Sequence, residues 1–441
     1  MTATGLLCRL AARAAPAAVA SALLAGAAVA DEAYAVHGQA TYVEQETGAF
    51  HAPYRGPNSL SPGEGRETFD ATLYLSARLW PGGEGWVSPE VDQGFGLDDT
   101  LGLAGFPSGE AYKVGRNRPY VRLPRAFLRQ TLELGGPRLS AAPALLQLGG
   151  AASADRVVLT LGKFAVGDVF DANRYAHDPR SDFLNWAAVD AGTFDYAADA
   201  WGYTVGAALE WYRDAWTLRA GAFDLSSVPN SEHLEPAAHE FQMLVECERR
   251  YELGGRPGWL LVTGYDSRGR MALLADALRR AAATGGAVDP AAVRRYRSRT
   301  GVHLTLGQQL AADLGAFARL GRAGGDVEAY EFTDVDRSAA AGLSLRGARW
   351  RRAGDTLAVA AIVNGISAQR QRFLDAGGLG ILVGDGRLAH AGPERIGEAY
   401  YSVAVVAQAY LTLDYQFVTN PAYSRDRGPV SVFAARLHAE F

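Results

Sequence analysis

The sequence predicts an all-β protein, a transmembrane antiparallel β-barrel of about 16 strands with long extracellular or in-folded loops. The last residues alternate with period two, which places Phe433, Leu437 and the terminal Phe441 on one face and Arg436 and His438 on the other. A secretory leader precedes the first such segment. Beyond that leader, no run approaches the roughly 18 apolar residues that a spanning helix requires. A closed barrel is then the architecture that satisfies the backbone in lipid.

Residues 1–30 have the pattern of a signal peptide. Arg9 and Arg13 precede a stretch rich in Ala, Leu and Val, and Ala28-Val-Ala30 supplies the small residues of a cleavage site. We therefore predict that residues 1–30 are removed and that residues 31–441 form a single outer-membrane barrel domain.

Composition agrees with this location. Hydrophobic residues make up 48% of the 441-residue chain, an ordinary value, which a barrel produces because every second strand residue faces water. Cys247 is the only cysteine after the leader, which excludes an intramolecular disulfide and a multi-cysteine metal site. The formal net charge of −5 gives no reason to expect nucleic acid as a partner.

Segments of roughly ten residues with a one-sided apolar stripe recur between clusters of Gly, Pro and Asp. In one of them Phe69, Leu73 and Leu75 alternate with Asp70 and Tyr74. The expected strands lie, in chain order, near residues 36–45, 69–79, 85–93, 120–134, 156–164, 200–212, 215–224, 240–251, 258–267, 302–306, 313–322, 337–347, 355–364, 396–404, 411–417 and 431–441. An even count suits a bacterial barrel with both termini in the periplasm.

The connections between these strands fall into two classes. Short links, which predict periplasmic turns, lie near 213–215, 309–312 and 404–409. Long links, which predict extracellular or in-folded loops, lie at 94–119, 165–200, 269–299 and 365–395. Residues 272–283 are rich in Ala and Leu and predict a short surface helix.

Period-two stripes also describe a secreted two-sheet sandwich or a propeller. A propeller would show a fixed internal repeat, and the sequence has none. The terminal Phe441 and the leader favour the membrane barrel over both alternatives.

Polar residues of the strands are expected to face the lumen, because an arginine facing lipid at the midplane would cost roughly 2 to 4 kcal/mol. The candidate pore residues on the early strands are Arg78, Glu90, Asp92, Arg125 and Arg129. The connection 165–200 mixes aromatic and charged residues, and we expect part of it to narrow the lumen. Its candidates are Asp171, Arg174, Tyr175, Asp182 and Trp186. The alternative is an external loop packed on its own aromatic residues.

Five strings stand out in and beside the long connections: Gly105-Phe-Pro-Ser-Gly-Glu-Ala-Tyr-Lys-Val-Gly115, Leu161-Gly-Lys-Phe164, Asp171-Ala-Asn-Arg-Tyr-Ala-His-Asp-Pro-Arg180, Asp182-Phe-Leu-Asn-Trp186 and Phe194-Asp-Tyr-Ala-Ala-Asp-Ala-Trp-Gly-Tyr203. With shorter strings further on, they resemble the carbohydrate-selective porin (OprB) family over most of the chain after the leader. The resemblance implies a 16-stranded outer-membrane barrel through which monosaccharides such as glucose diffuse down their gradient.

The chemistry of the candidates is compatible with that implication. Sugar rings have apolar C–H faces and a rim of hydroxyls, so a sugar pore needs aromatic platforms and charged groups that exchange for water without binding tightly. Arginines opposite carboxylates favour neutral solutes over a strong ion preference. The expected partners are small sugars, membrane lipid and, through Phe441, the outer-membrane assembly machinery, with no cofactor or metal. Whether the barrel forms a homotrimer stays open.

The sequence leaves two other functions open. One is a general small-solute porin. The other is an outer-membrane barrel hydrolase, which the sequence does not favour because it has no Gly-x-Ser-x-Gly nucleophile turn and no paired-His metal spacing.

Overall fold

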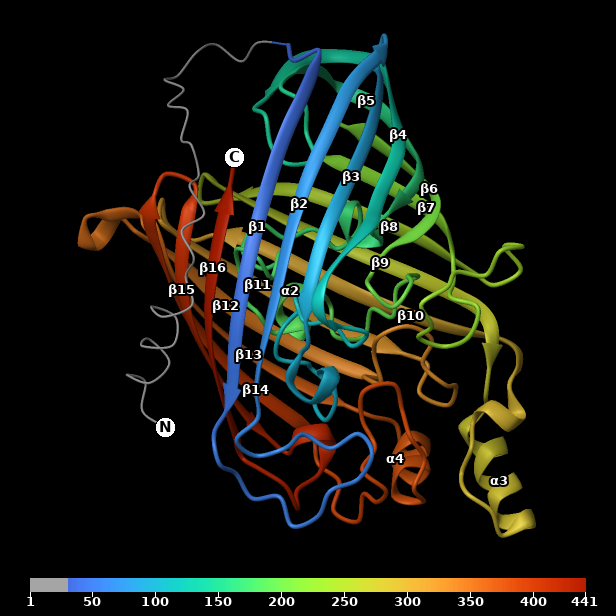
Figure 1. Cartoon of the computed structure of the whole chain (residues 1–441). Coiled ribbons are helices and arrows are strands. Elements are labelled where there is room, and N and C mark those ends of the chain that lie inside the picture. Colours follow the sequence, from blue (N-terminus) through green and yellow to red (C-terminus); the bar gives the residue numbers. More distant parts are fainter. Residues whose placement is uncertain (1–30) are drawn as a thin grey trace.

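The computed structural model describes residues 31–441, and the predicted signal peptide lies outside them. Sixteen antiparallel strands form one closed barrel in which β1 pairs with both β2 and β16 (Figure 1). The strands are β1 Tyr34–Thr47, β2 Gly65–Trp80, β3 Gly83–Gly94, β4 Arg116–Ala141, β5 Gly150–Phe164, β6 Thr204–Arg213, β7 Trp216–Asp224, β8 Phe241–Leu253, β9 Arg256–Met271, β10 Arg295–Gln309, β11 Leu314–Ala323, β12 Arg337–Gly347, β13 Arg352–Gly365, β14 Glu394–Val406, β15 Ala409–Thr419 and β16 Val430–Glu440. The predicted antiparallel barrel and its strand number are therefore confirmed.

Helices occur in the connections. The α-helices are α2 Trp186–Val189, α3 Leu274–Thr284 and α4 Ala368–Asp375, and the 3₁₀ turns are Leu97–Thr100, Val166–Asp168, Ala291–Val293, Ala348–Trp350 and Pro421–Tyr423. The predicted helix at 272–283 is confirmed as α3, which ends where Gly285 adopts the left-handed conformation. Within residues 31–441, no helix combines the length and the hydropathy needed to cross a membrane.

The wall shows the expected alternation. On β2, Leu73 and Leu75 are 42% and 39% exposed, whereas Tyr74 between them is 3% exposed. The apolar side chains thus cover the outer surface and the polar ones face the lumen, as a barrel in lipid requires.

The two ends of the barrel differ in their connections. β6 and β7, β8 and β9, and β14 and β15 are joined by two residues each, whereas the connections on the opposite end include α3 and α4 (Figure 1). By the general architecture of outer-membrane barrels, the short turns face the periplasm and the long connections face the outside. β4 and β5 extend further than predicted, because their pairing continues to Ala141 and Gly150 after the apolar stripe has ended.

The connection between β5 and β6 folds into the barrel. Its side chains Phe170, Phe183 and Phe194 are fully buried, and Trp186 is 3% exposed. The prediction that this connection enters the lumen is confirmed, and the alternative of a self-packed external loop is wrong. The connection between β3 and β4 enters as well, since Phe106 stacks on Trp186 with ring centroids 5.2 Å apart. Sequence reasoning did not single out this second insertion.

Candidate functional site

Two buried aspartates of the in-folded connection attach it to the barrel wall. The first is Asp171, whose carboxylate accepts from Arg319 Nε at 3.3 Å, from the Ala191 backbone N–H at 2.8 Å and from the Thr305 hydroxyl. Asp171 is fully buried, and Arg319 also donates to the carbonyl of Ala188 at 2.6 Å. Because each charge is met by several partners, this ion pair fixes the inserted chain against β11.

The second anchor is Asp195. Arg299 on β10 donates to it at 2.5 Å, and both side chains are fully buried. The same carboxylate accepts backbone N–H groups of Tyr330 and Glu331 at 2.7 and 3.0 Å. Asp195 thereby joins the β5–β6 connection to the β11–β12 connection, and the inserted loops form one body inside the lumen.

The wall is notched where the inserted chain touches it. A Cβ atom on Gly315 of β11 would lie 2.0 Å from the ring of Tyr175, and one on Gly321 would lie 2.1 Å from the Thr193 hydroxyl. These separations are far below van der Waals contact, so both positions accept only glycine while the loop keeps its place.

A cavity of about 600 Å³ runs beside the inserted body. Its lining includes Trp201 and Tyr203, which precede β6 at the long-connection end, and Leu145 and Leu146 in the short β4–β5 connection. The lining thus extends from one end of the barrel to the other. Between these ends the cavity is bordered by Tyr74, Glu90, Glu110, Arg122, Arg125, Arg180, Trp186, Asp190 and Tyr196.

Arg180, on the inserted connection, is the centre of the charged network in this cavity. Its guanidinium lies 3.3 Å from Asp70, 3.4 Å from Glu110 and 3.7 Å from Glu90. Burial opposes the charged form of Arg180, but Asp70 and Glu110 outweigh it and hold the pKa of the guanidinium well above its usual range. Arg180 therefore stays a cation inside a ring of acids.

Two more arginines complete the network from β4. Arg122 pairs with Glu90 at 2.8 Å and with Asp92, and Arg125 pairs with Asp168 at 2.7 Å. Arg125 and Arg122 also lie 5.0 and 5.5 Å from the ring centre of Tyr203. The cavity wall thus offers guanidinium groups, carboxylates and an aromatic face within one stretch.

Two acids of the inserted connections have raised pKa values. Burial, assisted by Asp70 and opposed by Arg180, raises the pKa of Glu110 well above its usual range. Burial also raises the pKa of Asp190 to about 6, against the opposing effect of His177. The carboxylates that face the arginines are consequently not all charged at neutral pH, so the opposing charges nearly balance.

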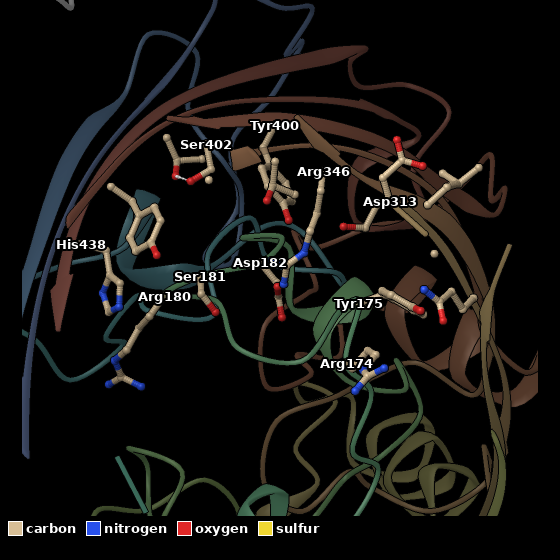
Figure 2. A pocket seen from close by; sticks show the side chains of 18 of the residues that line it. Arg174, Tyr175, Arg180, Ser181, Asp182, Asp313, Arg346, Tyr400, Ser402 and His438 are labelled. Carbon is tan, nitrogen blue, oxygen red and sulfur yellow. Dashed lines mark hydrogen bonds between the residues drawn. The ribbon is translucent and has the colours of Figure 1, made fainter. Parts of the chain in front are cut away.

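A second cavity, of about 500 Å³, opens at the periplasmic end (Figure 2). Figure 2 shows Arg174, Tyr175, Asp182, Arg346 and His438 around it. Tyr175 stacks on Trp259 with ring centroids 5.5 Å apart, and Arg174 lies 5.5 Å from the centre of the same ring. Arg180 lines both cavities, so the segment that carries it separates them.

The ten predicted site residues fall into four groups. Glu90, Arg125 and Trp186 line the larger cavity. Asp92 does not line it but forms an ion pair with Arg122, which does. Arg174, Tyr175 and Asp182 line the periplasmic cavity. The remaining three lie elsewhere: Asp171 is the fully buried anchor, Arg78 bonds the carbonyls of Glu32 and Gly149 near the periplasmic rim, and Arg129 donates to the carbonyl of Leu146 and packs over Trp86 and Phe127.

Several lining residues were not among the candidates. Arg180 is the most central of them, followed by Arg122, Glu110 and Tyr203. Tyr74 and Asp70 share the inward face of β2, which the alternation of that segment indicated. Arg180 and Glu110 sit on irregular chain, where no period marks a direction, so only the folded structure places them.

The closed barrel, its lipid-facing surface and its charged, aromatic-lined passage define an outer-membrane porin. The chain belongs to one family of this class. Residues 58–441 match the model of the carbohydrate-selective porin, OprB family.

One solved structure supports the fold, and two others are less similar. The high-pH structure of Pseudomonas putida OprB superposes with a TM-score of 0.70 at 15% identity, covering 93% of this chain and 94% of that one. The low-pH structure of the same protein gives 0.49 at 13% identity over 93% of both chains. The channel DcaP of Acinetobacter baumannii gives 0.47 at 9% identity over 92% of this chain and 97% of that one. Among curated proteins no match was found.

Proposed function

We propose that this porin lets monosaccharides such as glucose pass into the periplasm by facilitated diffusion along the larger cavity, with its narrowest contact at Arg180. The observation that supports this most is the ring of Asp70, Glu90 and Glu110 around Arg180 in a lining that also carries Trp186 and Tyr203. Such a wall matches both surfaces of a sugar, the hydroxyl rim and the C–H face.

The mechanism follows from the strength of these contacts. A sugar that enters from the outside replaces water on Arg122 and Arg180, whose fixed forks can donate to pairs of neighbouring hydroxyls. Each arginine is already paired with acids, so a sugar hydroxyl exchanges one hydrogen bond for another and gains little net free energy. Weak binding lets the sugar leave, which diffusion through a pore requires.

A planar-bilayer recording tests this function. We expect ion-conducting channels whose current is reduced by glucose in the bath in a concentration-dependent manner, and reduced less by a disaccharide. Equal reduction by sugars and by amino acids of similar size would instead favour a general small-solute porin. Turnover of ester or glycoside substrates by the purified protein would favour the hydrolase.

The expected partners and processing form part of the same proposal. We propose that residues 1–30 are cleaved, that residues 31–441 are the mature barrel and that lipid surrounds it. The ring of Phe441 packs directly on Gly38, where an added Cβ atom would lie 2.2 Å from the ring. The N–H of Phe441 donates to the Gly38 carbonyl at 2.9 Å. Recognition of Phe441 by the assembly machinery would therefore precede the pairing of β1 with β16. Comparison of the detergent-solubilised mass with that of one chain would distinguish a monomer from a homotrimer.

A further inference from the structure

Five arginines lie on the outside of the barrel, at the ends of strands that lead into the long connections. They are Arg268 and Arg270 on β9, Arg322 on β11, Arg337 on β12 and Arg395 on β14, and they are named the outer arginine belt here. Each of them is exposed.

The direction of these side chains follows from the alternation of their strands. On β11, Arg322 is two residues from Leu320, which is 56% exposed on the lipid-facing surface. On β9, Arg268 has the same parity as Val262, which is 44% exposed. Residues separated by an even number of positions on a strand share a face, so the belt continues the lipid-facing apolar surface toward the extracellular end.

The belt also lies at one level. β9 ends at Met271, β11 ends at Ala323, β12 begins at Arg337 and β14 begins at Glu394. Every arginine of the belt is therefore within three residues of a strand end on the extracellular side. In a membrane this is where the hydrocarbon stops and the headgroups begin.

The register makes the belt electrostatically unfavourable by itself. Arg322 and Arg337 are direct cross-strand partners. Like charges directly opposite each other destabilise a strand pair. Arg395 lies on the same side, two strands beyond β12 through β13, or roughly 10 Å by the usual strand spacing.

Acids of the protein do not neutralise these charges. No ion pair forms between the belt and any residue of 31–441, and the one side-chain bond in it runs from Arg337 to the carbonyl of Ile366 at 2.6 Å. Asp336, next to Arg337 in sequence, pairs with Arg370 at 3.1 Å. Asp266, two residues from Arg268, accepts from the Ser298 hydroxyl at 3.2 Å.

Two exposed arginines at the periplasmic end show the opposite arrangement. Arg349 is paired with Asp313 at 2.6 Å, and Arg352 is paired with Asp355 at 2.5 Å. The belt differs from these two arginines because it gathers five exposed positive charges along the extracellular rim over β9–β14, and none of the five is in an ion pair with a described residue.

We propose that the outer arginine belt binds the phosphate groups of a phosphorylated glycolipid in the outer leaflet. Arginine forks match phosphate oxygens in pairs, and a phosphate between Arg322 and Arg337 would turn their repulsion into a shared contact. The apolar surface directly below the belt would receive the acyl chains of the same molecule. One ligand thus satisfies both the charge and the surface beside it.

The test uses the purified barrel in detergent, titrated with bis-phosphorylated lipid A or with dephosphorylated lipid A, and follows the thermal unfolding midpoint. We expect the midpoint to rise with the phosphorylated lipid alone. The double variant R322Q/R337Q should need about 30-fold more of that lipid for half of the rise, from about 1 kcal/mol per arginine near a charged lipid surface and 1.4 kcal/mol per tenfold. The matched control R349Q removes an exposed but paired arginine and should titrate like the unsubstituted protein.

Three results would overturn the proposal: an equal response to dephosphorylated lipid A, an unchanged titration of R322Q/R337Q, or an equal loss in R349Q. Unchanged single-channel conductance of the double variant shows that its barrel is intact. If the double variant does not fold, the unsubstituted protein still decides the matter, because raised salt must weaken a phosphate contact and leave a purely apolar contact in place.

Discussion

Replacement of Arg180 by glutamine is the perturbation that tests the proposed constriction most directly. The change removes one positive charge that lies 3.3 to 3.7 Å from Asp70, Glu110 and Glu90. Arg122 still neutralises Glu90 at 2.8 Å, so the uncompensated charge is concentrated on Asp70. The site changes from nearly balanced to negative, and we expect the channel to become cation-selective.

The size of the effect follows from Coulomb's law. One unit charge at about 4 Å is worth about 1 kcal/mol in water and about 4 kcal/mol at the effective dielectric constant of a protein surface. A water-filled passage lies toward the lower value. At 1.4 kcal/mol per tenfold, we expect the ratio of potassium to chloride permeability to rise by roughly five- to tenfold.

The assay is the reversal potential of single channels in a potassium chloride gradient at low ionic strength, where screening is weak. R279Q is the matched control, because Arg279 lies on α3, is paired with Asp276 and has a side chain that is 72% exposed. An unchanged reversal potential in R180Q would refute the placement of Arg180 in the conducting path. A shift of equal size in R279Q would show that general surface charge, and not the constriction, sets selectivity.

Three further predictions concern the inserted connection. Trp186→Ala should weaken the reduction of ion current by glucose severalfold and keep the barrel folded, since the ring lines the larger cavity and stacks on Phe106; unchanged reduction would remove Trp186 from the sugar path. Asp190→Asn should raise the thermal midpoint near pH 8 but not near pH 4. Because the pKa of Asp190 is raised to about 6 in the folded protein, the protonated carboxyl stabilises the fold below the unfolded pKa of about 4. This contribution, at most about 3 kcal/mol, is lost as pH rises through about 6. Heat-dependent gel migration at both pH values measures it, and an equal gain at both would contradict the reasoning. Asp171→Asn should cost about 3 kcal/mol, because it leaves Arg319 buried without its carboxylate, and should give larger and noisier currents; an unaltered recording and midpoint would show that the anchor is dispensable.

The barrel could be predicted from the sequence because the alternation of a strand is local. Leu73, Tyr74 and Leu75 reveal their faces without reference to any other segment. The predicted strand ends were less accurate where polar strands continue to pair beyond the lipid, as β4 does up to Ala141.

The site could be predicted only in part, because its central contacts join distant segments. Arg180 meets Asp70 across 110 positions of the sequence, and no local pattern marks such a pair. The composition of the inserted connection indicated that it enters the barrel, and Trp186 and Asp182 do line cavities. The same composition could not distinguish Asp171, whose charge is consumed by an internal ion pair, from residues that face water.

The glycines beneath the inserted connection have a consequence for how such porins change over time. Tyr175 and Thr193 occupy hollows that exist only because Gly315 and Gly321 have no side chain. A loop transplanted from a relative would fit only if the wall beneath it had matching hollows, and a bulkier side chain at either of these two points would clash with this wall. Diversification of the inserted segment is thus tied to mutation in β11, and the two should be exchanged as a unit when chimaeras are built.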